Sequence, residues 1–362
     1  MSWKNISKGN YDVDGSNLRS NLRNIVDNYK TTSINLVDTG REGTIVILNS
    51  IFAYNPNVKT INISSNLTSR ALTMSEMFQS CNNLTSVSNF NTSSVRDMSF
   101  MFQYCNNLTS VPNFDTSNVI NMSNMFYSCL NLTSVPNFNT DNAIYLRGAF
   151  TWCSKIRSVP SFSANNISTV DYMFFGCWNL ASVPYFNMSS VTSTAYLFAG
   201  CSNLTDIPLY DTSNVRQMNS MFSGCSNLSS SAISNISNFD TGNVFSFTQM
   251  FDDCYNMTSA PNLNFNNVEY VHQMFYNCTS LVDVPEFKFS NKRLVVEDMF
   301  QSCNNLSDAS IQNIINSFIN QKSVTVRSLS NSKQGSIFYL TNIANTRYQN
   351  RWAELDAAGW SY

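Results

Sequence analysis

Apolar and polar residues in the middle of the chain recur with a period close to 24 residues. Each repeat has Phe three residues before a Cys, Leu, Ile or Met three residues after it, and in most repeats Val or Ile six residues after it. One coil of this length cannot bury its own apolar face, so the pattern predicts a solenoid of stacked coils. The ten cysteines that mark the repeats are Cys81, Cys105, Cys129, Cys153, Cys177, Cys201, Cys225, Cys254, Cys278 and Cys303.

The segment after each Cys alternates apolar and polar residues, as in Leu132-Thr133-Ser134-Val135. This alternation predicts one short parallel strand per coil, with neighbouring strands about 4.8 Å apart. A degenerate unit at 51–58 has Asn55 in the Cys column. The expected fold class is therefore an α/β solenoid of about ten or eleven coils.

Both ends of the repeat array are expected to carry caps, because an open solenoid needs its end coils covered. Residues 16–30 have the spacing of an amphipathic helix, and strand-like segments follow at 33–37 and 44–48. Apolar residues at 311–318 and 348–355 have helical spacing beyond the last Cys. The predicted parts are an N-terminal cap at 1–50, a solenoid at 51–306 and a C-terminal helical cap at 307–362.

Asn recurs two residues after the Cys column, and one repeat carries a five-residue insertion at Ser231–Asn235. An Asn amide can bond the turn backbone of a neighbouring coil, so we expect a structural ladder rather than a ligand site. The insertion is interpreted as tolerated length variation, with a bulge that binds a partner as the alternative. The Asn column consists of Asn83, Asn107, Asn131, Asn179, Asn203, Asn227, Asn256 and Asn305.

Composition narrows the function. Only 12% of residues are charged and the net charge is −2, which argues against nucleic acid or an acidic membrane surface as partner. There is no apolar run long enough for a transmembrane helix, and the first residues contain no apolar core of a secretory signal. We therefore expect neither membrane insertion nor export by the secretory signal route.

Catalytic and metal chemistry find little support in the sequence. There is one histidine, His272, and no Cys-x-x-Cys pair, nucleotide-binding loop or nucleophile elbow. One Cys per coil in a buried column predicts a ladder of free thiols rather than disulfides. We expect a protein that is not an enzyme, with no cofactor and no metal site, in which His272 is a column substitution rather than a catalyst.

The repeat, with its Met-Phe-x-x-Cys-x-Asn-Leu-Thr-Ser-Val-Pro-x-Phe core, resembles the Cys-containing BspA-like leucine-rich repeat of bacterial surface proteins, mycoplasma lipoproteins and phage structural proteins. The resemblance covers about residues 51–306 and implies a leucine-rich-repeat solenoid, wound as a right-handed superhelix, that is used in adhesion or protein interaction. The segment 352–360 is similar to the ends of repeat proteins encoded in gut-phage structural modules. With no secretory signal, these resemblances imply a phage virion protein, assembled in the host cytoplasm, that works at the tail, fibre or capsid surface. A cytosolic repeat protein is the other explanation for the missing signal.

Function is expected where the uniform repeat varies, and the most variable positions hold aromatic residues. Flat rings beside Asn, Ser and Asp suit stacking on a host-surface glycan or packing on another virion protein or receptor. The alternatives are that the rings pack between coil edges or against a second copy, and that the chain is a bacterial cell-surface adhesin. The candidate ligand-binding residues are Tyr104, Tyr127, Trp152, Phe175, Trp178, Tyr185, Tyr210, Tyr255 and Tyr276.

Overall fold

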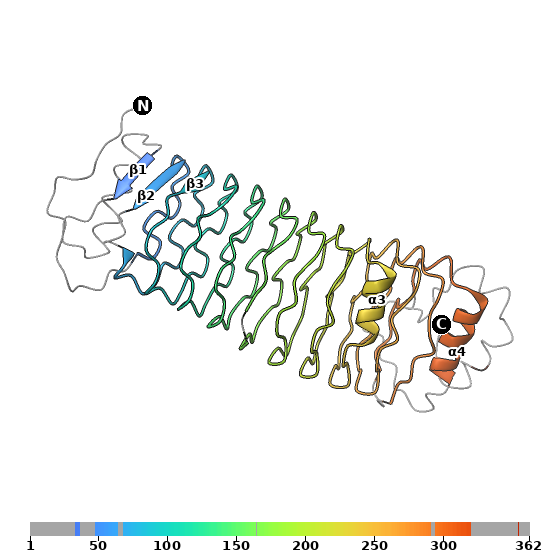
Figure 1. The fold of residues 1–362 in the computed structure, drawn as a ribbon. Helices are drawn as coiled ribbons and strands as arrows, with labels where there is room; N and C mark the ends of the chain where they lie inside the picture. The colour runs from blue at the N-terminus through green and yellow to red at the C-terminus, as the bar shows by residue number, and fades with distance from the viewer. Residues whose placement is uncertain are drawn as a thin grey trace. The chain divides into compact units, whose positions relative to one another are not determined.

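The computed structural model describes residues 33–36, 48–63, 68–163, 165–290, 294–319 and 354. The chain divides into two compact units, Met1–Leu180 and Ala181–Tyr362. Each unit contains a stack of coils (Figure 1). The first unit contains the parallel strands β1 (Ser33–Leu36), β2 (Thr60–Ile63) and β3 (Ser86–Val87), and the second contains the helices α3 (Ser230–Ser237) and α4 (Asp308–Ile319). Within the described ranges we find no helix with the length and apolar character of a membrane span.

The coils are joined mainly by the segment that leads up to each Cys, which we call the turn ladder. Alternate backbone N–H groups donate to carbonyls of the next coil, and the intervening N–H groups donate to the carbonyl three residues earlier in the same coil. Every second residue thus continues the stack while its neighbour closes a turn, which satisfies the backbone donors of a buried edge. In the coil of Cys81 the four donors to the next coil are Met74, Glu76, Phe78 and Ser80, at 2.7 to 2.9 Å.

The turns of the ladder require left-handed backbone at two fixed positions, five residues and one residue before the Cys. In the first coils these are Glu76 and Ser80, with φ of 58° and 59°. Ser50 and Tyr54 have φ of 54° and 63° at the same two distances from Asn55. Asn55 therefore occupies the Cys column of a further coil, which confirms the repeat frame predicted for 51–58.

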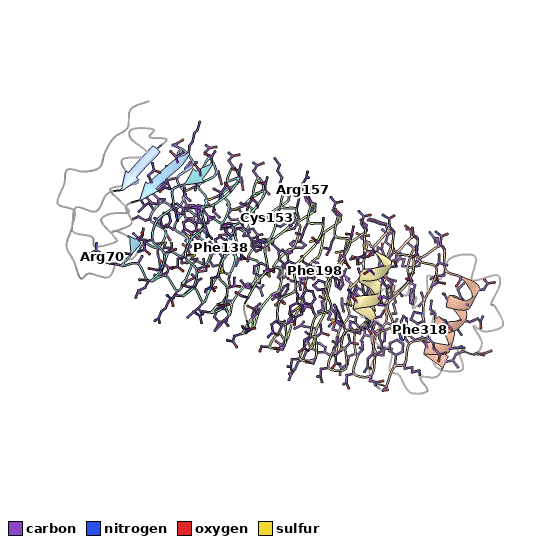
Figure 2. All side chains as sticks on the ribbon, viewed as in Figure 1. Arg70, Phe138, Cys153, Arg157, Phe198 and Phe318 are labelled. Carbon is purple, nitrogen blue, oxygen red and sulfur yellow. The ribbon has the colours of Figure 1, made fainter. Side chains whose placement is uncertain are left out.

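The core is built from ladders of identical side chains. Phe78, Phe102 and Phe126 are fully buried, and their rings stack with centroids 5.1 and 5.6 Å apart. In Figure 2 the side chains of Phe138 and Cys153 lie within the coils, whereas exposed Arg157 reaches outward. Stacking gives each ring an apolar neighbour above and below, in the offset arrangement that aromatic pairs favour.

The predicted strand in every coil is mostly wrong. From residue 51 onward the predicted strand forms only as β2 and β3, and elsewhere among the described residues the same column makes at most a single bridge, such as Ser182 with Asp206. The cause is the proline two residues further on, which has no N–H to continue the ladder. β3 is followed by Ser88 in the Pro column, and the Ser88 N–H donates to the Ile61 carbonyl at 3.0 Å. We call the three residues that begin at the Pro column the Pro-Asn-Phe segment.

Two coils replace the Pro-Asn-Phe segment with a helix. The insertion at 231–235 lies in α3, so it is neither a loop nor a bulge. Ser229 caps α3 by accepting a hydrogen bond from the Ala232 N–H at 3.1 Å, while Ile233 and Ile236 are buried. Ser307 stands in the same place before α4 and accepts from the Ser310 N–H at 3.2 Å.

The predicted helical face at 311–318 is present in α4, where Ile311, Ile314, Ile315 and Phe318 are buried. The predicted strand at 33–37 is present as β1, one residue shorter. The predicted helix at 16–30, the predicted helix at 348–355 apart from Glu354, and nearly all of the strand at 44–48 lie outside the described residues. The pair of caps and the three-part division of the chain therefore stay predictions.

Candidate binding surface

All ten cysteines are free and buried, as the repeat pattern predicts. Nine of the ten thiols also have a partner that the sequence does not reveal, because the Sγ donates to the Phe carbonyl of the preceding coil. Cys105 bonds Phe78 in this way at 3.1 Å. Burial raises the pKa of Cys81 to about 12, so these thiols are neutral and unreactive at ordinary pH. The cysteine column is a structural ladder, and it does not supply nucleophiles.

The Asn column forms the predicted ladder. Asn131 donates from Nδ2 to the Asn106 carbonyl of the preceding coil at 2.8 Å, and Asn227 bonds the Ser202 carbonyl at 2.9 Å in the second unit. These amides close the turns that follow the cysteines. They are occupied within the fold, in agreement with the expectation that they serve structure rather than a ligand.

His272 lies in the turn ladder of the second unit, partly exposed, with Nδ1 3.2 Å from Glu297 Oε2 of the next coil. His272 thus occupies a regular position of the repeat and lies beside Glu297, a residue of the next coil. Within the described part of the chain no group of three or more His, Cys, Asp or Glu side chains is placed to hold a metal ion.

Five of the predicted aromatic residues lie together on one edge of the first unit, which we call the aromatic ridge. They occupy positions from two residues before to one residue after the Cys column on successive coils. Contacts are edge-to-face, with ring centroids 5.4 Å apart for Tyr104 and Tyr127 and 5.7 Å apart for Trp152 and Trp178. Trp178 is the most exposed ring, at 49%. The ridge consists of Tyr104, Tyr127, Trp152, Phe175 and Trp178.

Trp152 is the structural centre of the ridge. It stands at the left-handed position before the Cys, with φ 60°, where other coils place Ser, Gly, Asp or Asn and two coils place Tyr54 and Tyr104. Its indole lies over Gly176 of the next coil so closely that a Cβ on Gly176 would meet Trp152 Cε3 at 2.6 Å. Phe175 packs edge-on at 5.0 Å. A large ring in strained backbone costs stability, and such strain concentrates at functional sites.

The remaining candidates do not belong to the ridge. Tyr255 and Tyr276 occupy the same columns in the second unit, where Tyr255 is 43% exposed. The prediction that Tyr210 is a surface ligand-binding residue is corrected by the structure. Tyr210 is only 2% exposed, and its hydroxyl donates to the Pro184 carbonyl at 3.1 Å. It substitutes for a core Phe and offers no surface to a ligand. Tyr185 is exposed and stacks on Tyr210 with centroids 6.1 Å apart.

Three neighbours of the ridge were not predicted from the sequence. Tyr172 packs edge-on against Phe175 at 6.0 Å, and the Arg147 guanidinium lies 5.1 Å from the centre of the Tyr172 ring. Arg147 also approaches Asp171, with Nη1 3.7 Å from Oδ2. Tyr172 occupies the left-handed column five residues before the Cys, with φ 60°. An aromatic residue at this position of the repeat is the sequence feature from which this neighbour of the ridge could have been predicted.

The fold defines a repeat protein of stacked coils, and the ridge is a cluster of aromatic side chains on its surface. The chain belongs to the family DUF285, described as "Mycoplasma protein of unknown function", whose model matches residues 20–135, 46–161, 106–207, 144–234 and 192–314. A search of curated proteins finds no match to this chain.

Solved leucine-rich-repeat proteins are similar to the chain. A protein from Bacteroides ovatus shares 17% identity with a TM-score of 0.37, and the match covers 76% of this chain and 73% of that protein. A leucine rich cell surface protein from Faecalibacterium prausnitzii shares 14% identity (TM-score 0.34, 78% and 90% covered). A protein from T. pallidum shares 16% identity (TM-score 0.34, 56% and 80% covered). The solenoid assignment itself rests on the hydrogen bonds between coils described above. None of these matches concerns a phage protein.

Proposed function

We propose that this protein is a non-enzymatic binding module whose aromatic ridge docks a protein partner. The observation that carries the proposal is the cluster of half-exposed rings on a frame whose other columns are nearly uniform. Aromatic residues and Arg are enriched at the cores of protein interfaces, where they supply most of the binding energy. Arg147 lies beside the ridge and is more than half exposed.

The orientation of the rings favours a protein over a sugar at this surface. Sugar stacking needs an open ring face, but one face of Trp152 is covered by Gly176, and the Phe175 and Trp178 rings pack against the same indole in T-shaped contacts. A compact group of rings with one half-exposed indole at its end suits insertion into a partner's apolar pocket. The ridge is therefore assigned to a protein surface in this proposal.

In this proposal the protein works in the virion of a phage, at its tail, fibre or capsid surface. Support comes from the similarity of the segment 352–360 to proteins of phage structural modules. The alternative is a bacterial cell-surface adhesin, supported by the description of the F. prausnitzii relative as a cell surface protein. An antibody against the chain separates the two, since it labels purified virions in the first case and intact cells in the second.

Site-specific cross-linking tests the ridge directly. A photoreactive phenylalanine analogue replaces Trp178 in one sample and Leu209, an equally exposed apolar residue, in the other. Irradiation of assembled particles or cells should yield a cross-linked protein from position 178 and none from position 209. No protein adduct at 178, or equal adducts at both positions, would contradict the proposal.

A further inference from the structure

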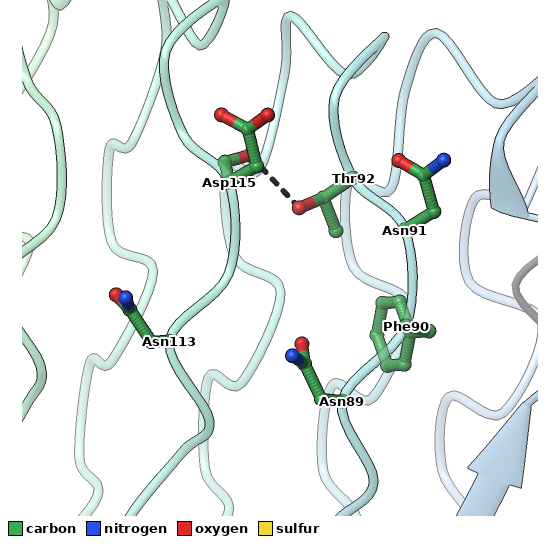
Figure 3. Close-up of a pocket in the computed structure, with 6 residues that line it drawn as sticks. All are labelled: Asn89, Phe90, Asn91, Thr92, Asn113 and Asp115. Atoms are coloured by element: carbon green, nitrogen blue, oxygen red, sulfur yellow. Dashed lines mark hydrogen bonds between the residues drawn. The ribbon is translucent and has the colours of Figure 1, made fainter.

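The first unit has a second surface, on other columns than the aromatic ridge, where polar groups are left without partners. A pocket of about 370 Å³ opens between the coils of Cys81 and Cys105, lined by Asn89, Phe90, Asn91, Thr92, Asn113 and Asp115. Figure 3 shows the Asn89 and Asn113 side chains extending in the same direction from adjacent coils. The Thr92 hydroxyl donates to the Asp115 carbonyl at 2.8 Å and ties the two coils together beside the pocket.

The pocket recurs in the same register two coils further on. A second pocket of about 330 Å³ is lined by Asn137, Phe138 and Asn139 of one coil and by Ser161 and Ser163 of the next. Asn89 and Asn137 both stand eight residues after the Cys, in one column with Asn113. Three successive coils therefore present an Asn at the same position, and the next coil presents Ser161 there.

These asparagines differ from those of the Asn column. Among the described residues, neither the backbone N–H nor the side-chain amide of Asn89, Asn113 or Asn137 forms a hydrogen bond. Asn91, by contrast, accepts from the Ser93 N–H at 2.9 Å within its own turn. Asn89, Asn113 and Asn137 are exposed, so each offers a free donor and acceptor pair to a ligand.

The lining selects a neutral, hydroxylated ligand. No Lys or Arg lines either pocket, while Asp115 and Asp141 each contribute a carboxylate that disfavours phosphates and other anions. Ser117 donates from its hydroxyl and its N–H to Asp115 Oδ1, which lowers the pKa of that carboxyl and keeps it an acceptor. Hydroxyl groups match such a surface because they both donate to amide and carboxylate oxygens and accept from amide nitrogens.

The direction in which the pockets follow one another, and the distance from coil to coil, point to a polymeric ligand. The pockets follow one another across the coils, whereas a peptide strand could pair with backbone groups only along a coil. On this face the step from coil to coil is short, with the Phe90 and Phe114 ring centroids 4.9 Å apart. An extended chain of equatorially linked pyranose sugars advances by a similar distance per sugar.

We propose that the Asn89, Asn113 and Asn137 column is a track that binds a linear, neutral glycan of equatorially linked pyranose units, roughly one sugar per coil. The glycan lies across the coils, its hydroxyls bond the free amides, and the edges of buried Phe90 and Phe138 form the floor. This site is separate from the protein-binding ridge, and neither proposal depends on the other.

Calorimetric titration of the full chain tests the proposal, with cellohexaose and chitohexaose as probes. At least one should bind, the matching disaccharide should bind at least tenfold more weakly, and maltohexaose, whose axial linkage curves the chain, should not bind. The double variant N89A/N113A should bind about tenfold more weakly, the size expected for two lost neutral hydrogen bonds. The control N57A/N82A removes two exposed amides elsewhere in the same unit and should bind like the wild type.

Two results would overturn the proposal. One is the absence of binding to both linear hexasaccharides. The other is binding that N89A/N113A leaves unchanged. Both can occur while the cross-link at position 178 still forms, so failure of the glycan track is distinguishable from failure of the protein-binding ridge.

Discussion

The turn ladder and the Pro-Asn-Phe segment belong to the same coil but are held in different ways. In the coil of Cys105, four alternate N–H groups of the turn ladder donate to the next coil, whereas Pro112–Phe114 donates only the Phe114 N–H, back to the Pro112 carbonyl. The backbone of the stack is thus hydrogen-bonded between coils mainly at one edge. The other edge is joined by side-chain bonds such as that from Thr92 to the Asp115 carbonyl, and it keeps polar groups in contact with water. The difference teaches that stability and recognition can be assigned to separate columns of one repeat.

Alkaline pH should have the largest effect on stability, and it acts on the Cys column at the end of the turn ladder. Burial holds the pKa of Cys81 at about 12, against 9.0 for an unburied thiol, and raises the pKa of the other ladder thiols in the same direction. A raised folded-state pKa means that the contribution to stability is complete below pH 9 and is lost as the pH rises toward 12. Each pH unit in that window costs about 1.4 kcal/mol per thiol.

Thermal unfolding followed by circular dichroism between pH 8 and 11 measures this loss. The midpoint should fall steeply above pH 9, and less steeply in C105A, which has one thiol fewer to ionise. A midpoint that stays constant through pH 11 would show that the thiols do not hold the coils together as described.

A glycine pair tests how the ridge is built into the turn ladder. Gly176 and Gly224 have φ of 72° and 71°, so alanine at either position costs about 1–2 kcal/mol of left-handed strain. An added Cβ at Gly224 meets its nearest atom at 3.4 Å, but at Gly176 it meets the Trp152 indole at 2.6 Å. G176A should therefore destabilise by about 1–3 kcal/mol more than G224A.

The matched control for this pair is a second-site change. In the W152S background, where Ser stands as it does at Ser128, the extra cost of G176A should vanish. Denaturant titration of the four proteins gives the comparison. An equal cost for G176A with and without Trp152 would mean that the indole does not lie over Gly176.

Two asparagines provide the smallest and most specific contrast. N131A removes the hydrogen bond to the Asn106 carbonyl and should lower the free energy of unfolding by about 1 kcal/mol. N113A removes an amide that bonds nothing among the described residues, so its effect should stay within about 0.5 kcal/mol. Chemical denaturation of both variants decides, and a reversed order would be inconsistent with the assignment of the two columns.

The repeat frame could be predicted from sequence because the same residue types recur at fixed positions in each repeat. The spacing of Cys, Phe and Leu gives the coil, the Asn column gives its ladder, and Asn55 locates a further coil without a cysteine. Most of the predicted strands are absent because the proline that follows each alternating segment has no N–H to donate to the neighbouring coil. The alternation of apolar and polar residues does not reveal this. At β3, where Ser88 replaces that proline, the strand does form.

Other features depend on geometry that the sequence does not show. The thiol bonds to Phe carbonyls connect neighbouring coils, so no local pattern indicates them. Tyr210 resembles a surface ring until its hydroxyl is seen to reach the Pro184 carbonyl. The helix α3 was foreseeable, since the insertion removes the proline and spaces Ile233 and Ile236 on one face after Ser229. The free amides of Asn89 and Asn113 could be recognised only once the partners of every other column were known.

Amide hydrogen exchange resolved by residue tests the central claim most directly, because it reads the two regions in one molecule without mutation. The account predicts that the N–H groups of Met98, Phe100 and Phe102, which donate to the next coil, exchange slowly and only with opening of the stack. The N–H groups of Asn113 and Asn137 should exchange at nearly the rate of an unfolded peptide. Equal protection in both segments would contradict the separation of a fastened edge from an open one.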